Sequence, residues 1–314
     1  MRVISSIPSP TVSFFEVGPF RIHFYALFIL AGIAFAIWLG NRRFKARGGS
    51  AGAILDIALW AVPFGIIGGR FYHVITHWDF YFHAGADLSK VFAIWEGGLA
   101  IYGALLFGTL GAFVGARTAG IRFLSFADAI APGVIVAQAM GRLGNYFNNE
   151  LFGVPTTLPW GLEIPISNDA YPEGLPAGVL FHPTFLYEII WNLIGFGLIL
   201  VLERRFNLRW GRMFAAYLMV YSVGRAFIES IRLDPSDYYF GLRTNVWSAI
   251  FGLLIGMALL AWSLRRHKNL EESVYLPGRE PMIDSTEDAS AQGQPSHDEL
   301  DSDGTTAAAS ESKS

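Results

Sequence analysis

The sequence of 314 residues contains no cysteine, and only 16% of its residues are charged. The lack of cysteine excludes a disulfide scaffold, a thiolate metal site and a cysteine nucleophile on the chain itself. Soluble domains carry about 25% charged residues. The low charge content, together with 53% hydrophobic residues, therefore argues against a soluble globular protein. The basic residues lie scattered between apolar runs and form no stripe, which argues against nucleic-acid binding.

Long apolar stretches are abundant. A helix needs roughly 20 mostly apolar residues to cross the hydrocarbon core of a membrane. Seven stretches meet this requirement: residues 22–40, 53–75, 98–116, 123–143, 183–202, 211–229 and 245–264. The sequence therefore predicts an all-α integral membrane protein with seven transmembrane helices.

The loops between these stretches differ in charge. Alternate loops carry 13 lysines and arginines on one side and 5 on the other. Because basic loops stay in the cytoplasm, this alternation predicts the N-terminus outside and the C-terminus in the cytoplasm. Loops 76–97 and 150–182 then lie on the outer face.

The C-terminal stretch differs from the rest of the chain. Residues 269–314 hold 11 acidic and 2 basic residues, whereas residues 1–268 hold 15 acidic and 21 basic ones. A segment so polar cannot bury enough apolar surface to offset its ordering entropy. We therefore expect a seven-helix domain over residues 1–268 and an acidic, disordered cytoplasmic tail over residues 269–314.

Several charged residues fall inside the predicted spans, where each costs several kcal/mol unless it is paired or hydrated. Tyr221, Arg225, Glu229 and Arg232 share a stripe about 80° wide on the sixth span. One interpretation is an Arg225–Glu229 pair that holds two helices together. The other is the wall of a polar cavity, because the stripe carries two cations and one anion. The surplus charge then requires an anionic ligand or a partner from another helix.

Polar residues in the spans gather toward the predicted outer ends, which indicates one site open to the outer leaflet. They are His23, Tyr25, Arg70, Tyr102, Arg142, Glu150, His182, Tyr187, Tyr221, Arg225 and Glu229. The arginines favour an anionic head group, because a guanidinium binds two phosphate oxygens at once. A transporter or binding protein for an anionic lipid or solute fits this composition too. Transporters, however, usually show internal repeats and sites at mid-bilayer, and the sequence shows no repeat.

One short motif is specific. The run Gly141–Gly153, GRLGNYFNNELFG, resembles the signature of the prolipoprotein diacylglyceryl transferases. Further segments match in the family's order over about residues 15–265. They are His23–Tyr25, Gly68–Arg70, Trp95–Gly98, His182–Glu188 and Tyr221–Arg232.

The resemblance implies a bacterial, multi-pass enzyme of the plasma membrane with its active site toward the outer leaflet. Such an enzyme transfers the diacylglyceryl group of phosphatidylglycerol to the thiol of the lipobox cysteine of a prolipoprotein. Glycerol phosphate is released, and lipoprotein maturation begins with this step. The family uses no metal or organic cofactor. The partners expected from the resemblance are phosphatidylglycerol, other membrane lipid and prolipoprotein signal peptides.

The resemblance also implies roles for residues. Arg142 and Arg225 match the family's two essential arginines, and Tyr102 falls at a proposed catalytic position. The residues expected to bind phosphatidylglycerol are Tyr25, Arg70, Arg142, Asn145, Glu150, Gly153, His182, Tyr187, Glu188, Tyr221, Arg225, Glu229 and Arg232.

Tyr102 is a departure from the family, because many members carry histidine there. Histidine titrates near neutrality, whereas tyrosine has a pKa of about 10, which makes Tyr102 a poor base. Either the base lies elsewhere or Tyr102 positions a group by hydrogen bonding. Asn149 is a second departure, since glycine is common at that position.

Overall fold

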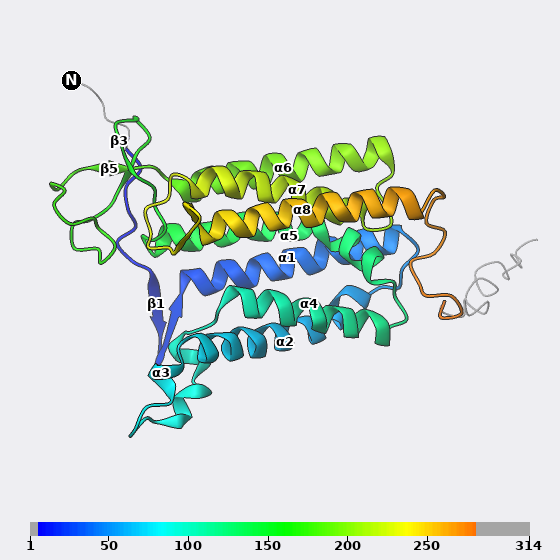
Figure 1. The fold of residues 1–314 in the computed structure, drawn as a ribbon, viewed down its shortest axis with the longest axis horizontal. Coiled ribbons are helices and arrows are strands. Elements are labelled where there is room, and N and C mark those ends of the chain that lie inside the picture. The colour runs from blue at the N-terminus through cyan, green and yellow to red at the C-terminus, as the bar shows by residue number, and fades with distance from the viewer. Residues whose placement is uncertain (1–5, 281–314) are drawn as a thin grey trace, which may run out of the picture. The chain divides into compact units, whose positions relative to one another are not determined.

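The computed structural model describes residues 6–280. Its helices account for most of the chain and run side by side along one axis (Figure 1). The long helices are α1 Phe24–Ala46, α2 Ala53–Thr76, α4 Ile101–Thr118, α5 Phe123–Phe147, α6 Thr184–Phe206, α7 Arg212–Glu229 and α8 Thr244–Arg266. Each predicted span overlaps one of them, so the all-α architecture is confirmed.

Six of the long helices are apolar and long enough to cross a membrane, which makes this a multi-pass membrane protein. The remaining long helix, α7, is not among them. It has 18 residues and carries Arg212, Arg225 and Glu229. The structure thus supports six candidate spans. The remaining predicted span forms the helix α7, but its hydropathy does not establish that it crosses the membrane.

Small residues allow the helices to pack closely, as in other membrane helix pairs. Where α2 meets α4, a Cβ added to Gly103 would lie 2.2 Å from the carbonyl oxygen of Gly68. Where α1 meets α5, a Cβ added to Gly133 would lie 2.8 Å from Cα of Ala36. These contacts exclude any larger residue unless the helices move apart.

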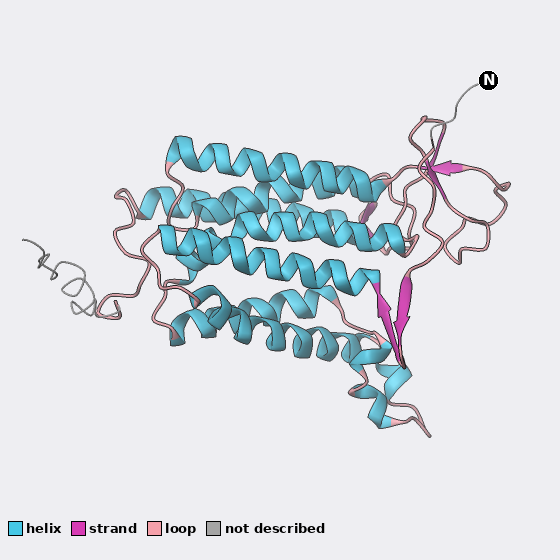
Figure 2. Ribbon diagram, turned by 180° about the vertical axis from the view of Figure 1, so that it is seen from behind, coloured by secondary structure: helices cyan, strands magenta, loops and turns pink. Residues whose placement is uncertain are grey.

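Short strands and helical turns, which the sequence did not predict, lie together at one end of the bundle (Figure 2). We refer to this end of the helix bundle as the strand end. They are β1 Phe14–Val17, β2 Phe20–His23, α3 Trp78–Tyr81, η1 Leu88–Val91, η2 Ile94–Glu96, β3 Pro155–Thr156, β4 Leu162–Glu163, β5 Leu180–Phe181, β6 Tyr238–Tyr239 and β7 Leu242–Arg243. β1 pairs with β2 and β6 with β7, both antiparallel.

The loop between α5 and α6 is more ordered than its irregular sequence suggested. Its strands form a three-stranded antiparallel sheet in the order β3-β5-β4. Phe152, Leu162, Ile164 and Phe181 form a small apolar core beneath it. The loop is therefore a folded cap over the strand end.

At the opposite end, the chain after α8 folds back onto the bundle. Val274 and Tyr275 are buried there. The carbonyl of Val274 accepts a hydrogen bond from the amide of Arg122, and the Tyr275 hydroxyl accepts one from the amide of Ser50. The compact unit thus extends to residue 280 rather than 268, because an apolar pair interrupts the polar segment. The rest of the predicted tail, residues 281–314, lies outside the described residues.

Candidate active site

Five helices bring polar side chains together at the strand end. α5 and α7 end there, and α4, α6 and α8 begin there (Figure 1). Because successive helices run in opposite directions, residues far apart in sequence reach the same depth. The residues are Tyr102 on α4, Arg142 on α5, Glu188 on α6, Arg225 and Glu229 on α7, and Asn245 on α8.

Glu188 joins the two arginines that the motifs singled out. Its Oε2 lies 2.7 Å from Nε of Arg142, and its Oε1 lies 3.2 Å from Nη1 of Arg225. The contact with Arg142 is an ion pair, and the contact with Arg225 is also a hydrogen bond that Nη1 donates, so the buried carboxylate holds the two guanidiniums close to one another. The structure therefore brings Arg142, Arg225 and Glu188 together, as the sequence predicted.

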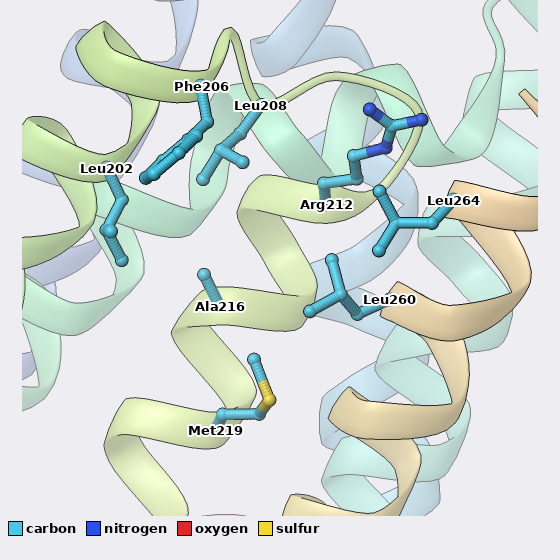
Figure 3. A pocket seen from close by; sticks show the side chains of 8 residues that line it. All are labelled: Leu202, Phe206, Leu208, Arg212, Ala216, Met219, Leu260 and Leu264. Atoms are coloured by element: carbon cyan, nitrogen blue, oxygen red, sulfur yellow. The ribbon is translucent and has the colours of Figure 1, made fainter. Parts of the chain in front are cut away.

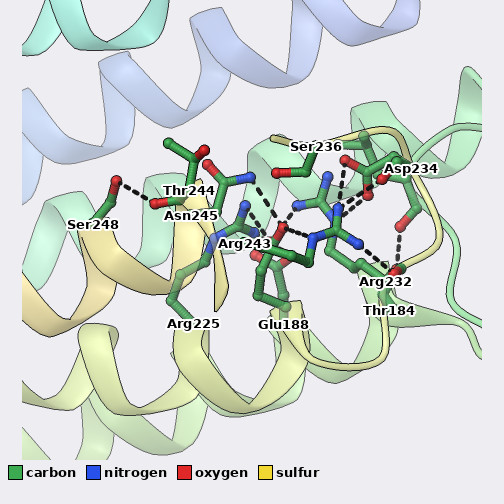
Figure 4. Close-up of polar contacts among 12 residues, drawn as sticks. Thr184, Glu188, Arg225, Arg232, Asp234, Ser236, Arg243, Thr244, Asn245 and Ser248 are labelled. Atoms are coloured by element: carbon green, nitrogen blue, oxygen red, sulfur yellow. Dashed lines mark hydrogen bonds and ion pairs between the residues drawn. The ribbon is translucent and has the colours of Figure 1, made fainter. Parts of the chain in front are cut away.

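Glu229 is the second centre of the network and is fully buried. Its Oε2 lies 2.8 Å from Nη2 of Arg225 and 3.3 Å from Nη1 of Arg232. Its Oε1 lies 3.0 Å from Nε of Arg243 and accepts a hydrogen bond of 3.0 Å from Nδ2 of Asn245 (Figure 4). The Arg225–Glu229 pair considered from spacing thus exists, within a larger network.

Arg232 and Arg243 form the buried part of this network. Asp234 bridges them: its Oδ1 lies 2.7 Å from Nε of Arg232, and its Oδ2 lies 3.3 Å from Nη2 of Arg243. Breaking a buried ion pair costs several kcal/mol, because it leaves one charge unpaired. These two arginines therefore hold the α7–α8 connection together. Arg232 was predicted to bind lipid; in the structure its side chain is 4% exposed and forms ion pairs with Glu229 and Asp234.

The network is balanced in charge. Arg142, Arg225, Arg232 and Arg243 pair with the carboxylates Glu188, Glu229 and Asp234, and a fourth carboxylate, Glu150, joins the network through Asn145. The surplus positive charge of the α7 stripe is thus balanced by carboxylates outside α7, Glu188 and Asp234. This is one of the two alternatives that the sequence left open.

The two pairs of arginines differ in access. The side chains of Arg142 and Arg225 are 19% and 14% exposed, against 4% and 8% for Arg232 and Arg243. Within residues 6–280, Nη2 of Arg142 and Nε of Arg225 have no hydrogen-bond partner. The accessible pair therefore has donors left over for an anion.

The signature motif at the end of α5 orients Arg142. Nη1 of Arg142 donates a 2.9 Å hydrogen bond to Oδ1 of Asn145, and Nδ2 of Asn145 donates a 2.7 Å bond to Oε1 of Glu150. Glu150 returns to α5 because the helix stops at Phe147 and Asn149 adopts a positive φ of 51°. Asn145 and Glu150 thus contact the site through Arg142.

Gly153 and His182 lie beside the network and have a packing role. A Cβ on Gly153 would lie 2.8 Å from Cβ of His182 and 2.9 Å from the carbonyl oxygen of Ile231. Nδ1 of His182 lies 3.0 Å from the Tyr187 hydroxyl, which also accepts a hydrogen bond from Nε1 of Trp160. Among the described residues, no hydrogen bond or ion pair joins the side chains of this group to Arg142 or Arg225.

Tyr102 reaches α8. Its hydroxyl lies 2.8 Å from Oγ of Ser248 and 3.3 Å from Oδ1 of Asn245. Because Asn245 also donates to Glu229, it links Tyr102 to the partner of Arg225. Sequence reasoning missed Asn245 and Ser248. Their only signal was polarity at the start of a predicted span.

The other two tyrosines of the predicted set pack against the same helices. Tyr25 covers Gly144, where an added Cβ would lie 2.4 Å from its ring. Tyr221 stacks on Tyr217 with ring centroids 6.1 Å apart. Both contacts are apolar, so the structure assigns these rings to the walls of the site region and shows no polar bond from either hydroxyl within residues 6–280.

Arg70 is separate from the network. Its guanidinium donates to the carbonyl oxygens of Val91 at 2.8 Å, Gly97 at 2.7 Å and Gly98 at 3.1 Å, and also to that of Lys90. These bonds hold the loop between α3 and α4 against α2. The expected contact of Arg70 with a lipid phosphate has no support in this arrangement.

The fold and the site define a class: a multi-pass membrane protein with a partly exposed arginine pair, held by buried carboxylates at one end of its helices. The family model described as prolipoprotein diacylglyceryl transferase matches residues 12–262 of this sequence.

Relatives extend the match over most of the chain. A Leifsonia xyli protein is 50% identical over 303 residues, covering 93% of this chain and 91% of that protein. A Mycobacteroides abscessus protein is 46% identical over 296 residues, covering 91% and 85%. Both are named phosphatidylglycerol--prolipoprotein diacylglyceryl transferase. The chain belongs to the prolipoprotein diacylglyceryl transferase family and is a transferase.

Proposed function

We propose that this chain transfers the diacylglyceryl group of phosphatidylglycerol to the thiol of the lipobox cysteine of a prolipoprotein. The observation that carries the proposal is the pair Arg142 and Arg225. Both guanidiniums contact Glu188, and both retain accessible donors at the strand end. A phosphodiester needs such donors, because a planar guanidinium can bind two of its oxygens.

In the reaction, Arg142 and Arg225 hold the phosphate of phosphatidylglycerol. The thiolate sulfur of the acceptor attacks the phosphate-bearing carbon of the diacylglyceryl moiety. A carbon–sulfur bond forms, and the carbon–oxygen bond to the phosphate breaks. The thiol proton ends on the released glycerol phosphate. Charge grows on the phosphate as that bond breaks, so fixed guanidiniums stabilise the transition state more than the ground state.

The arginine pair also favours the attacking species. A thiolate, rather than a thiol, is the nucleophile, and nearby cations lower the pKa of a thiol. Glu188 and Glu229 keep the two guanidiniums in place, and Asn145 with Glu150 orients Arg142. Tyr102 supports the site through Asn245 and Glu229 by hydrogen bonding and does not act as the base.

The membrane arrangement completes the proposal. We place α7 as a seventh transmembrane helix between α6 and α8, with the N-terminus outside and the C-terminus in the cytoplasm. In support, the arginines and lysines after α1, α4, α6 and α8 all lie at the end opposite the strand end. The positive-inside rule then puts the strand end, and with it the site, at the outer leaflet of the plasma membrane.

The test is a transfer assay with purified protein in detergent, phosphatidylglycerol and a peptide that contains a lipobox cysteine. Mass spectrometry follows the peptide. We expect a diacylglyceryl adduct on cysteine that disappears in Arg142→Ala, while Arg205→Ala, a change to an exposed arginine at the other end, retains it. Binding of phosphatidylglycerol without any adduct in the wild type would favour a lipid-binding or transport function instead.

A further inference from the structure

An apolar groove lies at the end of the bundle opposite the candidate active site, between α6 and α8 and over α7. Its volume is about 410 Å³, within the range of roughly 300–1,000 Å³ seen for small-molecule sites. Figure 3 shows its two walls and its floor. The lining residues are Leu202, Phe206, Leu208, Arg212, Ala216, Met219, Leu260 and Leu264.

The groove is deep over α7 because Ala216, at its floor, has a small side chain. Ala216 and Met219 form the floor, while Leu202 and Phe206 from α6 and Leu260 and Leu264 from α8 rise on either side (Figure 3). α7 also packs tightly onto α8, since a Cβ on Gly256 would lie 2.8 Å from Cγ of Met219. The result is a recess along α7 on a surface made of candidate membrane-spanning helices.

One charged residue, Arg212, stands at the mouth of this apolar recess. Nε of Arg212 donates to Oγ of Ser263 at 3.1 Å, and Nη2 donates to the carbonyl oxygens of Ser263 at 3.3 Å and His267 at 2.5 Å. All of these acceptors are neutral. Among residues 6–280, no carboxylate lies within ion-pair distance of Arg212, and its Nη1 has no partner.

The surroundings of Arg212 carry further positive charge. Arg209 precedes α7, and Arg265, Arg266 and Lys268 lie at the end of α8. Burial is the main cause that lowers the pKa of His267, the charges of Arg266, Arg212 and Arg122 add to it, and Glu271 opposes it. The nearby cations, rather than the burial, favour a bound anion.

We propose that the groove between α6 and α8 binds one anionic phospholipid, with an acyl chain along α7 and the phosphate on Arg212. An acyl chain matches the apolar walls, and the phosphate supplies the missing anionic partner. The proposal rests on the membrane character of the helices and is independent of the transfer reaction.

This lipid is distinct from the substrate of the candidate active site. Arg212 and Arg225 are 13 positions apart on α7. At 1.5 Å per residue, they are roughly 20 Å apart along the helix axis. The bound lipid covers the cytoplasmic half of α7 in the orientation proposed above.

The test uses photoactivatable lipids and the full-length protein in nanodiscs. Phosphatidylserine and phosphatidylcholine carry the same diazirine-labelled acyl chain, and mass spectrometry maps the labelled peptides. Phosphatidylserine provides an anionic phosphate lipid that is not the proposed substrate. We expect it to label the groove peptides roughly tenfold more than phosphatidylcholine does. Both lipids carry a phosphate, but the choline cation of phosphatidylcholine cancels the net negative charge that the cations around Arg212 attract.

Variants separate charge from shape. Arg212→Gln should reduce phosphatidylserine labelling to the phosphatidylcholine level, and Arg212→Lys should retain most of it because the charge remains. Ala216→Leu should reduce labelling by both lipids, since it raises the floor. Arg117→Gln, at an exposed arginine on α4 at the same end of the bundle, is the matched control and should change nothing, because α4 does not line the groove.

Three results would overturn the proposal. One is equal labelling of the groove by both lipids in the wild type, which would mean bulk lipid only. Another is equal behaviour of Arg212→Gln and Arg117→Gln when thermal unfolding shows both to be folded. Protection of the groove by inorganic phosphate alone would also contradict it, because the site would then bind free phosphate. Loss of transferase activity has no bearing on any of these readouts.

Discussion

Two clusters of buried charge lie at opposite ends of the same helices, and they differ in how far their arginines are exposed. At the strand end, Arg142 and Arg225 are held by Glu188 and Glu229 but remain partly exposed. At the opposite end, Arg47 is 3% exposed and lies 2.7 Å from Glu203, which Arg43 also contacts at 2.7 Å.

The second cluster is used for structure. Asp128, on α5, accepts hydrogen bonds from the amides of Gly211 at 2.8 Å and Phe214 at 2.9 Å, and so caps the start of α7. Glu203, on α6, joins the two arginines of the α1 end. The comparison shows that a buried charge in a membrane helix does not identify a site. Accessible donors on a fixed cation do.

The largest expected effect distinguishes the clusters by activity. Arg225→Ala should lower the rate of transfer by about 10²–10³-fold, the loss typical of removing one transition-state donor. Arg43→Ala should leave the rate per folded molecule near the wild-type value and lower the thermal unfolding midpoint, because Glu203 loses a partner. Transfer rates from the peptide assay and thermal unfolding midpoints in the same detergent would measure this difference between the two variants. Equal losses of activity in both variants would remove the distinction.

The next effect is on stability. Asp128→Ala removes two hydrogen bonds at the start of α7 and takes a carboxylate from the neighbourhood of Arg47, 3.8 Å away. We expect it to reduce the free energy of unfolding by about 3 kcal/mol. Denaturant titration in detergent measures this change. Asp128→Asn, which keeps one acceptor oxygen, should lose less, and an unchanged midpoint in both variants would contradict the capping role.

A third effect concerns the segment after α8, which folds back onto the same end of the bundle. Truncation after Lys268 removes buried Val274 and Tyr275. It should reduce the free energy of unfolding by about 3 kcal/mol, since burial of one large apolar side chain contributes roughly 1.5–3 kcal/mol. Truncation after Glu280 should leave the midpoint unchanged. If both truncations behaved alike, the end of the folded domain would lie elsewhere than residue 280.

The smallest expected effect is at Tyr102. Tyr102→Phe removes bonds to Ser248 and Asn245, and one net hydrogen bond contributes about 0.5–1.5 kcal/mol, so we expect a loss of activity of about tenfold or less. Asn245→Ala should lose more, because it also frees Glu229. Rates across a pH series separate the roles: a shifted profile in Tyr102→Phe would indicate proton transfer rather than positioning.

Much of the site was predictable because its parts are local motifs. The run around Arg142 and the stripe around Arg225 can be read from a few neighbouring residues, and the structure brings them together through Glu188. The role of Arg70 could not be predicted. Its partners are carbonyl oxygens of a loop whose path is set by packing, and any arginine near a span end looks the same in sequence.

The sequence by itself determined the membrane character and the positions of the helices, since hydropathy over about 20 residues is a local property. Its motifs also identified Arg142 and Arg225 as candidates for binding an anion. Only the tertiary structure decided that the network is balanced in charge and that Arg232 and Arg243 are buried within it. The reason is that pairing and access depend on carboxylates contributed by other segments, and no spacing within one helix encodes their distances.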